Sequence, residues 1–327
     1  MAKGWGMLFV ILAHLGLPYH LGKWIYTFHM PLFFFLSGYV FSEKYSFKKF
    51  FQKKVKCLLI PYFCLGFVMT IFFVLRTYPL SQDIITPFLN ILKNVLVQKR
   101  WWTLWFLACL FFLNIFYYLL SKLFKNRSGY LHVTVVILTL VGLLYYHFGG
   151  EPLFWNVDVC LTALPFFHIG YCCRKKQFLD KYIFSRNPIY LGAIFLFLNV
   201  FTGLLNYKLT GGVGTLEMYR SVYGIVPLTY ISAFSGLFVI IIFSYRFTNK
   251  AIQYIGSNTL LYYAWHQTIM MPLVDDFYKK IGIFQTGPLS SELNMVRILL
   301  SLFLICFVLT ILNLMIQKTR LRFIIGK

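Results

Sequence analysis

Long uninterrupted runs of apolar residues make up most of the chain, and short polar or basic segments separate them. A helix needs about 20 apolar residues to cross the hydrocarbon core of a bilayer, and fewer where flanking polar side chains reach the interface. Because the runs are continuous rather than alternating, they predict helices and not the strands of a membrane barrel. The ten predicted spans cover approximately residues 4–18, 24–42, 57–76, 102–121, 131–148, 157–172, 188–205, 225–245, 257–274 and 297–316. We therefore expect an all-α integral membrane protein with about ten transmembrane helices in one bundle, forming a single domain over residues 1–327.

The amino-acid composition also indicates that the chain lies in a membrane. Of the 327 residues, 59% are hydrophobic and only 12% are charged, so a water-soluble fold would lack the polar side chains to cover its surface. A cleavable signal peptide is the competing interpretation of residues 1–18, with Lys3 as its basic region. No small-x-small cleavage site follows the apolar run, and this favours a first membrane span.

The distribution of charge predicts the orientation. With a cytoplasmic N-terminus, about two thirds of the 31 lysines and arginines fall on the inner side, and most of the nine acidic residues fall on the outer side. This is the bias of the positive-inside rule, so both termini are expected in the cytoplasm, with the chain in the cell membrane. The net charge of +22 is therefore a topology signal. Nucleic-acid binding is excluded, because no clustered basic face with groove-reading elements is present.

His14 is the first candidate for chemistry. It follows Lys3 by eleven residues, which a helix converts into a rise of about 16 Å, from the inner rim to roughly mid-membrane. An ionisable residue at that depth is expensive and functional by default. Desolvation favours a neutral imidazole, the form that a general base requires. A packing histidine bonded to a backbone carbonyl is the alternative.

Two further histidines and two carboxylates complete the candidate set. His29 opens an apolar stretch in which Pro31 removes an amide donor and frees a carbonyl. His266 lies inside the ninth predicted span. Asp158 and Glu217 are each able to orient a base histidine as the carboxylate of a triad does. Packing remains the alternative role for these residues.

A basic stretch with interleaved phenylalanines precedes the third predicted span. It includes Lys53, Lys54 and Lys56 on the predicted inner side. One interpretation is a membrane-surface anchor on anionic lipid. The other is a docking site for the phosphates of a cytosolic donor.

The seven cysteines lie in or beside predicted spans. None shows the spacing of a metal site, and Cys172 and Cys173 are adjacent at a cytoplasmic end. We expect free packing thiols and no metal. His132 and His168 lie near span ends, where solvation at the interface is the ordinary explanation.

Three stretches resemble a known family. The first runs from Lys3 to His14 and is similar to an Arg/Lys-x10-His signature. The second is Phe28-His29-Met30-Pro31-Leu32-Phe33-Phe34-Phe35-Leu36-Ser37-Gly38-Tyr39, with Lys54 and Lys56 before Leu58-Leu59-Ile60-Pro61-Tyr62. The third is Ile255-Gly256-Ser257-Asn258-Thr259-Leu260, which leads to His266. Together they resemble the acyltransferase-3 superfamily of multipass membrane O-acyltransferases, especially its bacterial fucose-4-O-acetylase-like members. Lys3 departs from the arginine of many members, and a bidentate phosphate contact is lost with it.

The resemblance implies a donor and an acceptor. Acyl-CoA, with acetyl-CoA as the expected form, would be a co-substrate that binds from the cytoplasm, and no permanently bound cofactor is expected. The residues near its phosphates would be Lys3, Lys53, Lys54 and Lys56. The acceptor would be a hydroxyl of a cell-surface or lipid-linked glycan. The expected partners are therefore membrane lipids, acyl-CoA and a sugar or polysaccharide.

The resemblance also implies roles in the reaction. His14 would deprotonate the sugar hydroxyl, or take the acyl group itself and pass it outward. His29 and His266 would orient groups or stabilise the oxyanion. Asp158 or Glu217 would contact the acceptor or a histidine.

Two other functions compete with this one. Ten helices with buried histidines also suit a glycan or small-solute transporter, and a non-catalytic partner of a polysaccharide synthase is a third possibility. The chain has no internal repeat of the kind that transporter halves show, and its lysine cluster lies beside the histidine-bearing spans. Both observations favour the enzyme.

Overall fold

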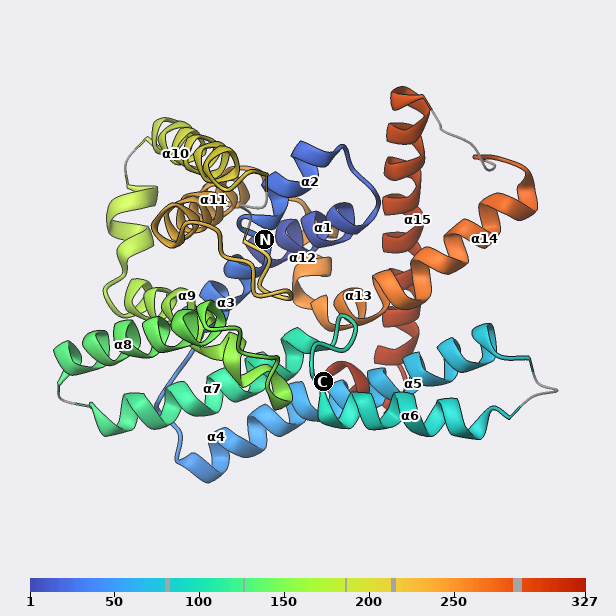
Figure 1. Cartoon of the computed structure of the whole chain (residues 1–327), viewed down its shortest axis with the longest axis horizontal. Helices are drawn as coiled ribbons and strands as arrows, with labels where there is room; N and C mark the ends of the chain where they lie inside the picture. Colours follow the sequence, from blue (N-terminus) through green and yellow to red (C-terminus); the bar gives the residue numbers. More distant parts are fainter. Residues whose placement is uncertain (80–82, 126, 186, 213–215, 285–289) are drawn as a thin grey trace.

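The chain folds almost entirely into helices (Figure 1). The computed structural model describes residues 1–79, 83–125, 127–185, 187–212, 216–284 and 290–327. Within these ranges no strand forms, and one isolated bridge joins Glu217 to Val222. The predicted all-α class is therefore confirmed.

The helices follow one another with short connections. In the first half they are α1 (Ala2–His14), α2 (Tyr19–Tyr26), α3 (His29–Tyr39), α4 (Phe47–Lys54), η1 (Val55–Leu59), α5 (Ile60–Thr77), α6 (Ile85–Val97), α7 (Trp105–Leu123), α8 (Ser128–His147) and η2 (Phe154–Asn156). In the second half they are α9 (Val157–Lys175), η3 (Leu179–Phe184), α10 (Pro188–Leu209), α11 (Val226–Arg246), α12 (Lys250–Ser257), α13 (Thr259–Trp265), η4 (His266–Met270), α14 (Met271–Ile281), α15 (Ser291–Gln317) and η5 (Arg320–Ile325).

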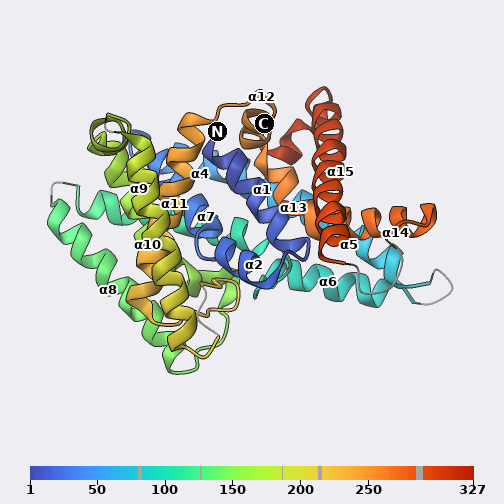
Figure 2. The same ribbon diagram turned by 90° about the horizontal axis from the view of Figure 1, so that it is seen from above.

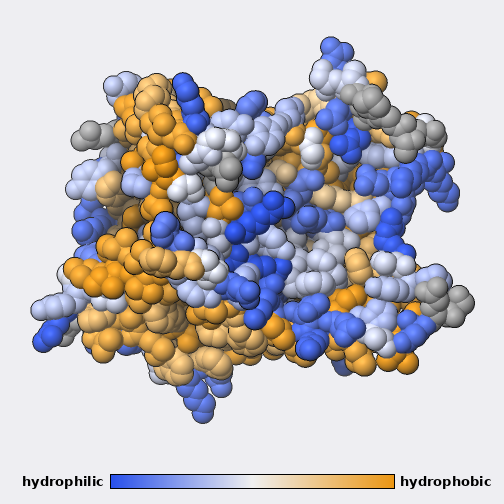
Figure 3. Space-filling model, viewed as in Figure 1, coloured by the Kyte–Doolittle hydropathy of each residue, from blue (hydrophilic) through white to orange (hydrophobic). Residues whose placement is uncertain are grey.

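Six helical segments in the described part of the chain are long and apolar enough to cross a membrane. They are Phe47–Thr77, which joins α4, η1 and α5, and the single helices α7, α8, α10, α11 and α15. Side chains on the outer faces of α8 and α10, such as Val136 and Phe201, are more than half exposed. An exposed apolar face of this kind is what a lipid solvent requires. Apolar side chains gather over this side of the molecule at the left of Figure 3.

Three of the expected spans differ from continuous crossing helices. The first ends at His14, because Gly16 takes a left-handed conformation (φ 77°) that stops α1. The second is divided into α2 and α3. Pro31 has no N–H to donate to the carbonyl of Thr27, so one helix ends there and the next begins. The ninth is divided among α12, α13, η4 and α14.

Prolines also explain two π-helical turns. The turn η1 precedes Pro61 by two residues, and η4 precedes Pro272 by two residues. A proline cannot pair with the carbonyl four residues earlier and its ring crowds that carbonyl, so the preceding turn widens. Single π turns occur frequently at functional sites, and His266 is the first residue of η4.

An additional helix lies in the predicted outer connection between residues 77 and 101. This is α6, an apolar helix of 13 residues that packs against α5. Its Val95 carbonyl accepts a hydrogen bond from the hydroxyl of Tyr62 on α5. The tyrosine thus ties α6 to the bundle, which a pattern of apolar run lengths does not predict.

Glycines allow the central helices to approach closely. At the crossing of α3 and α9, a Cβ on Gly38 would lie 1.8 Å from the Phe167 carbonyl oxygen, and one on Gly170 would lie 2.1 Å from the Phe35 carbonyl oxygen. Each glycine thus leaves room for the partner helix's backbone. Close packing of this kind replaces the hydrophobic driving force that lipid does not supply.

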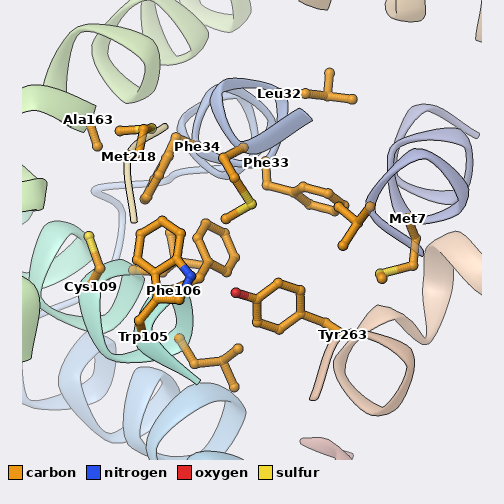
Figure 4. Packing of buried hydrophobic residues seen from close by; sticks show 14 of the residues in the cluster. Met7, Leu32, Phe33, Phe34, Trp105, Phe106, Cys109, Ala163, Met218 and Tyr263 are labelled. Atoms are coloured by element: carbon orange, nitrogen blue, oxygen red, sulfur yellow. The ribbon is translucent and has the colours of Figure 1, made fainter. Parts of the chain in front are cut away.

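One part of the hydrophobic core lies between α1, α3, α7 and α13. Figure 4 shows Met7, Phe34, Phe106 and Tyr263 from these four helices converging on one another. The rings of Phe34 and Phe106 are 4.9 Å apart, edge to face. This packing fixes the ends of α1 and α3, from which two of the candidate histidines project.

Both termini lie at one end of the bundle, next to α12 (Figure 2). Gly256 of α12 is in contact with the backbone of Gly4, and the Lys327 ammonium donates to Asn258 Oδ1 at 2.6 Å. The two chain ends are therefore on the same face of the protein.

Candidate active site

A cavity of about 530 Å³ lies where α1 ends and α3 begins. Its walls come from these two helices, the end of α5, residues 102–105, the loop of residues 216–220 and the segment around η4. The histidines that line it are His14, His29 and His266. The structure thus brings together all three histidines that the sequence singled out.

His14 is the last residue of α1 and is partly buried. Its ring centroid lies 5.2 Å from that of His266, and the two planes are tilted by 43°. Within the described residues, His14 has no hydrogen-bond partner, so both of its ring nitrogens are free to meet a substrate. The side chain lines the cavity, together with polar residues such as Glu217 and Arg220.

His29 and His266 have the same hydrogen-bonding arrangement. His29 Nδ1 lies 3.0 Å from the Ile25 carbonyl, and His266 Nδ1 lies 3.0 Å and 2.9 Å from the carbonyls of Tyr262 and Tyr263. A carbonyl only accepts, so each Nδ1 carries the proton and donates it. In the neutral ring Nε2 is then an acceptor. His266 Nε2 is buried and has no partner in the described part of the chain.

Tyr26 lies between two of these histidines. It was not among the site residues predicted from the sequence. Its ring centroid is 6.3 Å from that of His14 and 4.9 Å from that of His29. Tyr26 lines the cavity together with Glu217 and Arg220. The only sequence signal for this residue is its place just before the Pro31 helix break.

Glu217 also lines the cavity. Its side chain is 19% exposed and pairs with Arg220 Nε at 3.3 Å. Its backbone is held by the bridge to Val222. Glu217 is thus placed toward the space that a substrate would fill, and its ion-pair partner is an arginine and not a histidine.

Asp158 occupies a different position from the one expected for a partner of histidine. It is buried in an ion pair with Arg100, and its Oδ1 accepts from the Leu153 N–H at 3.2 Å. Arg100 in turn donates to the Tyr219 carbonyl, while the Tyr219 hydroxyl donates to the Arg100 carbonyl at 2.5 Å. Burial raises the pKa of the Tyr219 hydroxyl, which keeps the proton that it donates. Asp158 therefore supports the loop that carries Glu217 instead of orienting a base.

The four lysines lie away from the cavity. Lys3 and Lys54 are partly buried and close enough to repel each other, while Lys53 and Lys56 are exposed. No carboxylate of a described residue pairs with Lys3 or Lys54. Two like charges held together without a counter-ion make a favourable place for an anion.

Two further polar residues at the cavity rim were not predicted. Arg76 at the end of α5 makes a two-pronged contact with Asp276 on α14, with one of its bonds at 2.9 Å. Gln267 follows His266 in η4 and also lines the cavity. In the sequence, Arg76 could have been noticed only as a basic residue at the predicted outer end of a span.

The described chain is a bundle of membrane-length helices, and three histidines from separate helices line its cavity. A family model described as an acyltransferase domain, acyltransferase-3, matches residues 1–316 of this chain. The protein therefore belongs to the acyltransferase-3 family of membrane acyltransferases. Neither the curated proteins nor the solved structures contain a match to the chain.

Proposed function

We propose that this protein is a membrane O-acyltransferase. It transfers an acyl group, acetyl in the expected case, from cytoplasmic acyl-CoA to a hydroxyl of a cell-surface or lipid-linked glycan. The observation that carries the proposal is the convergence of His14, His29 and His266 on one cavity in a chain of this family. Imidazoles are the usual groups for moving a proton off a hydroxyl during acyl transfer.

The proposed topology has ten crossings and both termini in the cytoplasm of a bacterial cell, with residues 1–327 as one domain. The broken segments α2–α3 and α12–α14 each count as one crossing, and α1 and α9 supply two more. The meeting of both termini beside α12 supports an even number of crossings. Non-helical backbone at membrane depth is tolerated where it is buried in protein or lines a cavity. The break at Thr27 and Phe28 is buried, and the flanking residues Tyr26 and His29 line the cavity.

The donor site is proposed at the inner end of α1. Lys3 and Lys54 supply two ammonium groups for the phosphates of acyl-CoA, and the exposed Lys53 and Lys56 add to the positive field. Along α1, Lys3 and His14 are separated by a rise of about 16 Å. The thioester at the end of the long pantetheine arm would travel along this helix to reach the cavity.

Two routes of transfer are open at His14. As general base, a ring nitrogen takes the hydroxyl proton while the sugar oxygen attacks the thioester carbonyl. The C–S bond then breaks and the CoA thiolate leaves, to be protonated by the imidazolium. As relay, the ring nitrogen attacks the thioester first, the C–S bond breaks, and CoA leaves as the thiol with the ring N–H proton, so that an acyl-imidazole remains. The sugar hydroxyl then attacks the acyl carbonyl, the C–N bond breaks, and the imidazole takes the hydroxyl proton.

His29 and His266 would assist through Nε2. Since their Nδ1 protons are donated to backbone carbonyls, the neutral rings accept at Nε2 and suit holding or receiving a hydroxyl proton. Stabilising an oxyanion would require a second proton on the ring. Glu217 and Arg220 are proposed to contact acceptor hydroxyls, and Asp158 to act through Arg100 on that loop.

The experiment uses the purified full chain in detergent with acetyl-CoA and candidate glycan acceptors. Release of the CoA thiol that depends on the acceptor supports the proposal, and His14→Ala is expected to abolish it. His20→Ala is the matched control, because His20 is exposed and lies outside the cavity. Undiminished transfer by a folded His14→Ala variant would remove His14 from its role. Rapid quench with labelled donor alone separates the routes, since only the relay leaves an acylated protein.

A further inference from the structure

A second cluster of ionisable side chains lies outside the histidine cavity, between α8 and α9. His132, in the first turns of α8, meets His168 and Cys172, which are one turn apart on α9. Their ligand atoms all lie within 4.8 Å of one another. None of the three lines the cavity.

The buried member of the cluster is oriented by a tyrosine. The Tyr117 hydroxyl on α7 lies 2.7 Å from His168 Nδ1, and Tyr117 is fully buried. When Nδ1–H donates to this hydroxyl, His168 presents the Nε2 lone pair to the other two residues. Histidines that bind metals are usually held in this way, with the second ring nitrogen donating to a nearby oxygen.

The spacing is close to that of a tetrahedral metal site. Bond lengths of about 2.0–2.1 Å to nitrogen and 2.3 Å to sulfur place neighbouring ligands roughly 3.3–3.7 Å apart. His168 Nε2 and Cys172 Sγ are 3.7 Å apart. His132 Nδ1 and His168 Nε2 are 2.6 Å apart, and need to separate by about 1 Å or less. The exposed His132 side chain is free to make that movement.

We propose that His132, His168 and Cys172 form a Zn²⁺ site that ties the start of α8 to α9. Two imidazoles and one thiolate are a ligand set that suits zinc. Binding releases the Cys172 thiol proton to solvent and leaves a fourth position for water. In the proposed topology this end of α8 faces the cytoplasm, which supplies both the metal and a reducing environment for the thiol.

The test is metal titration of the full-length protein in detergent. The chain is purified through a tag that contains no histidine, stripped with a chelator and titrated with Co²⁺ and then with Zn²⁺. We expect one Co²⁺ per chain, an ultraviolet thiolate-to-cobalt charge-transfer band, and loss of that band when Zn²⁺ displaces Co²⁺. A titration with no thiolate band overturns the proposal.

Matched variants assign the ligands. Cys172→Ser is expected to remove the charge-transfer band and His132→Ala to remove stoichiometric binding. Cys173→Ser on α9 and His147→Ala on α8 should retain both. Equal binding by His132→Ala and His147→Ala would overturn the proposal, and because both residues are on α8 away from the core, folding is not in question.

A fourth variant tests the positioning role of Tyr117. Tyr117→Phe should keep the charge-transfer band but weaken metal affinity by about 10–100-fold, the usual effect of losing an outer-shell partner. Zn²⁺ should also raise the thermal unfolding temperature of the unmodified protein and leave that of His132→Ala unchanged. If Zn²⁺ leaves the unfolding temperature of the unmodified protein unchanged as well, then Tyr117, His168 and His132 form only a set of hydrogen bonds, and the proposal fails.

Discussion

The rings of His14 and His266 lie with their centroids 5.2 Å apart, although the two residues come from opposite ends of the chain. His14 ends α1 and His266 begins the π turn η4. The packing of α1 against α13 holds them together. In this pair His266 Nδ1 donates to backbone carbonyls, and its Nε2 has no partner among the described residues.

This relationship predicts that the two histidines act as a unit. We expect His266→Ala to lower kcat by about 10²–10⁴-fold, the usual contribution of a positioned base. The double variant with His14→Ala should lose little more than the larger single loss, because groups that act together are strongly non-additive. Steady-state kinetics of the four proteins measure this. Losses that multiply would show that the two residues act independently.

The proposed contact of Lys3 and Lys54 with the phosphates of acyl-CoA predicts that a change at Lys54 weakens donor binding. Lys54→Gln should raise KM for acyl-CoA by about tenfold or more, because a hydrogen bond to a charged phosphate contributes about 1.5–3 kcal/mol. Lys48→Gln is the control, since Lys48 is exposed on the same helix, α4. Initial rates at varied donor concentration measure KM. A KM equal to that of the control would contradict phosphate binding at Lys54.

The buried ion pair predicts a loss of stability. Asp158→Asn leaves the Arg100 charge buried without a counter-ion, which costs about 3–5 kcal/mol. We therefore expect a lower thermal unfolding temperature in detergent. We also expect a higher KM for the acceptor, because Arg100 donates a hydrogen bond to the Tyr219 carbonyl in the loop that carries Glu217. Arg220→Ala removes a mostly exposed pair worth about 0–1 kcal/mol and should leave the unfolding temperature unchanged. Equal melting of the two variants would argue against this assignment.

The crossing of α3 and α9 predicts a steric effect. In Gly38→Ala the new methyl group would meet the Phe167 carbonyl oxygen at 1.8 Å, so the helices must separate. Overpacking of this kind costs about 1–3 kcal/mol or more. Gly22→Ala is the control, because its Cβ meets no atom of the described chain within 4 Å. Melting curves in detergent compare the two, and a Gly38→Ala protein as stable as the control would contradict the close approach.

The fold was largely predictable where run length carried the information. The expected spans at α7, α8, α10, α11 and α15 are helices close to their predicted bounds. Prediction failed where a proline changed the hydrogen-bonding ladder, as Pro31 and Pro272 did. The length of an apolar run reflects hydrophobicity and does not show where a proline lacks a backbone N–H donor. A span that a proline interrupts is therefore predicted as one continuous helix.

The candidate site was partly predictable. Placing an ionisable side chain in an apolar membrane segment costs free energy, so such a residue is expected to be functional. His14, His29 and His266 were selected on this ground. Tyr26 and Arg100 carry no such mark, because an aromatic or basic residue near a span end is ordinary. Their roles depend on contacts that the fold makes, since the Tyr26 ring lies near His14 and His29, and Arg100 pairs with Asp158.

The membrane environment of this protein, its helical class and its family could be inferred from the residues alone. Each of these depends on composition, on local periodicity or on short motifs, which are properties of contiguous residues. Three other features became visible only in the folded chain: Asp158 pairs with Arg100, three histidines line one cavity, and Cys172 lies beside His132 and His168. Those outcomes depend on which helix faces cross, and the crossings are set by glycines and side-chain shapes on segments far apart in the chain.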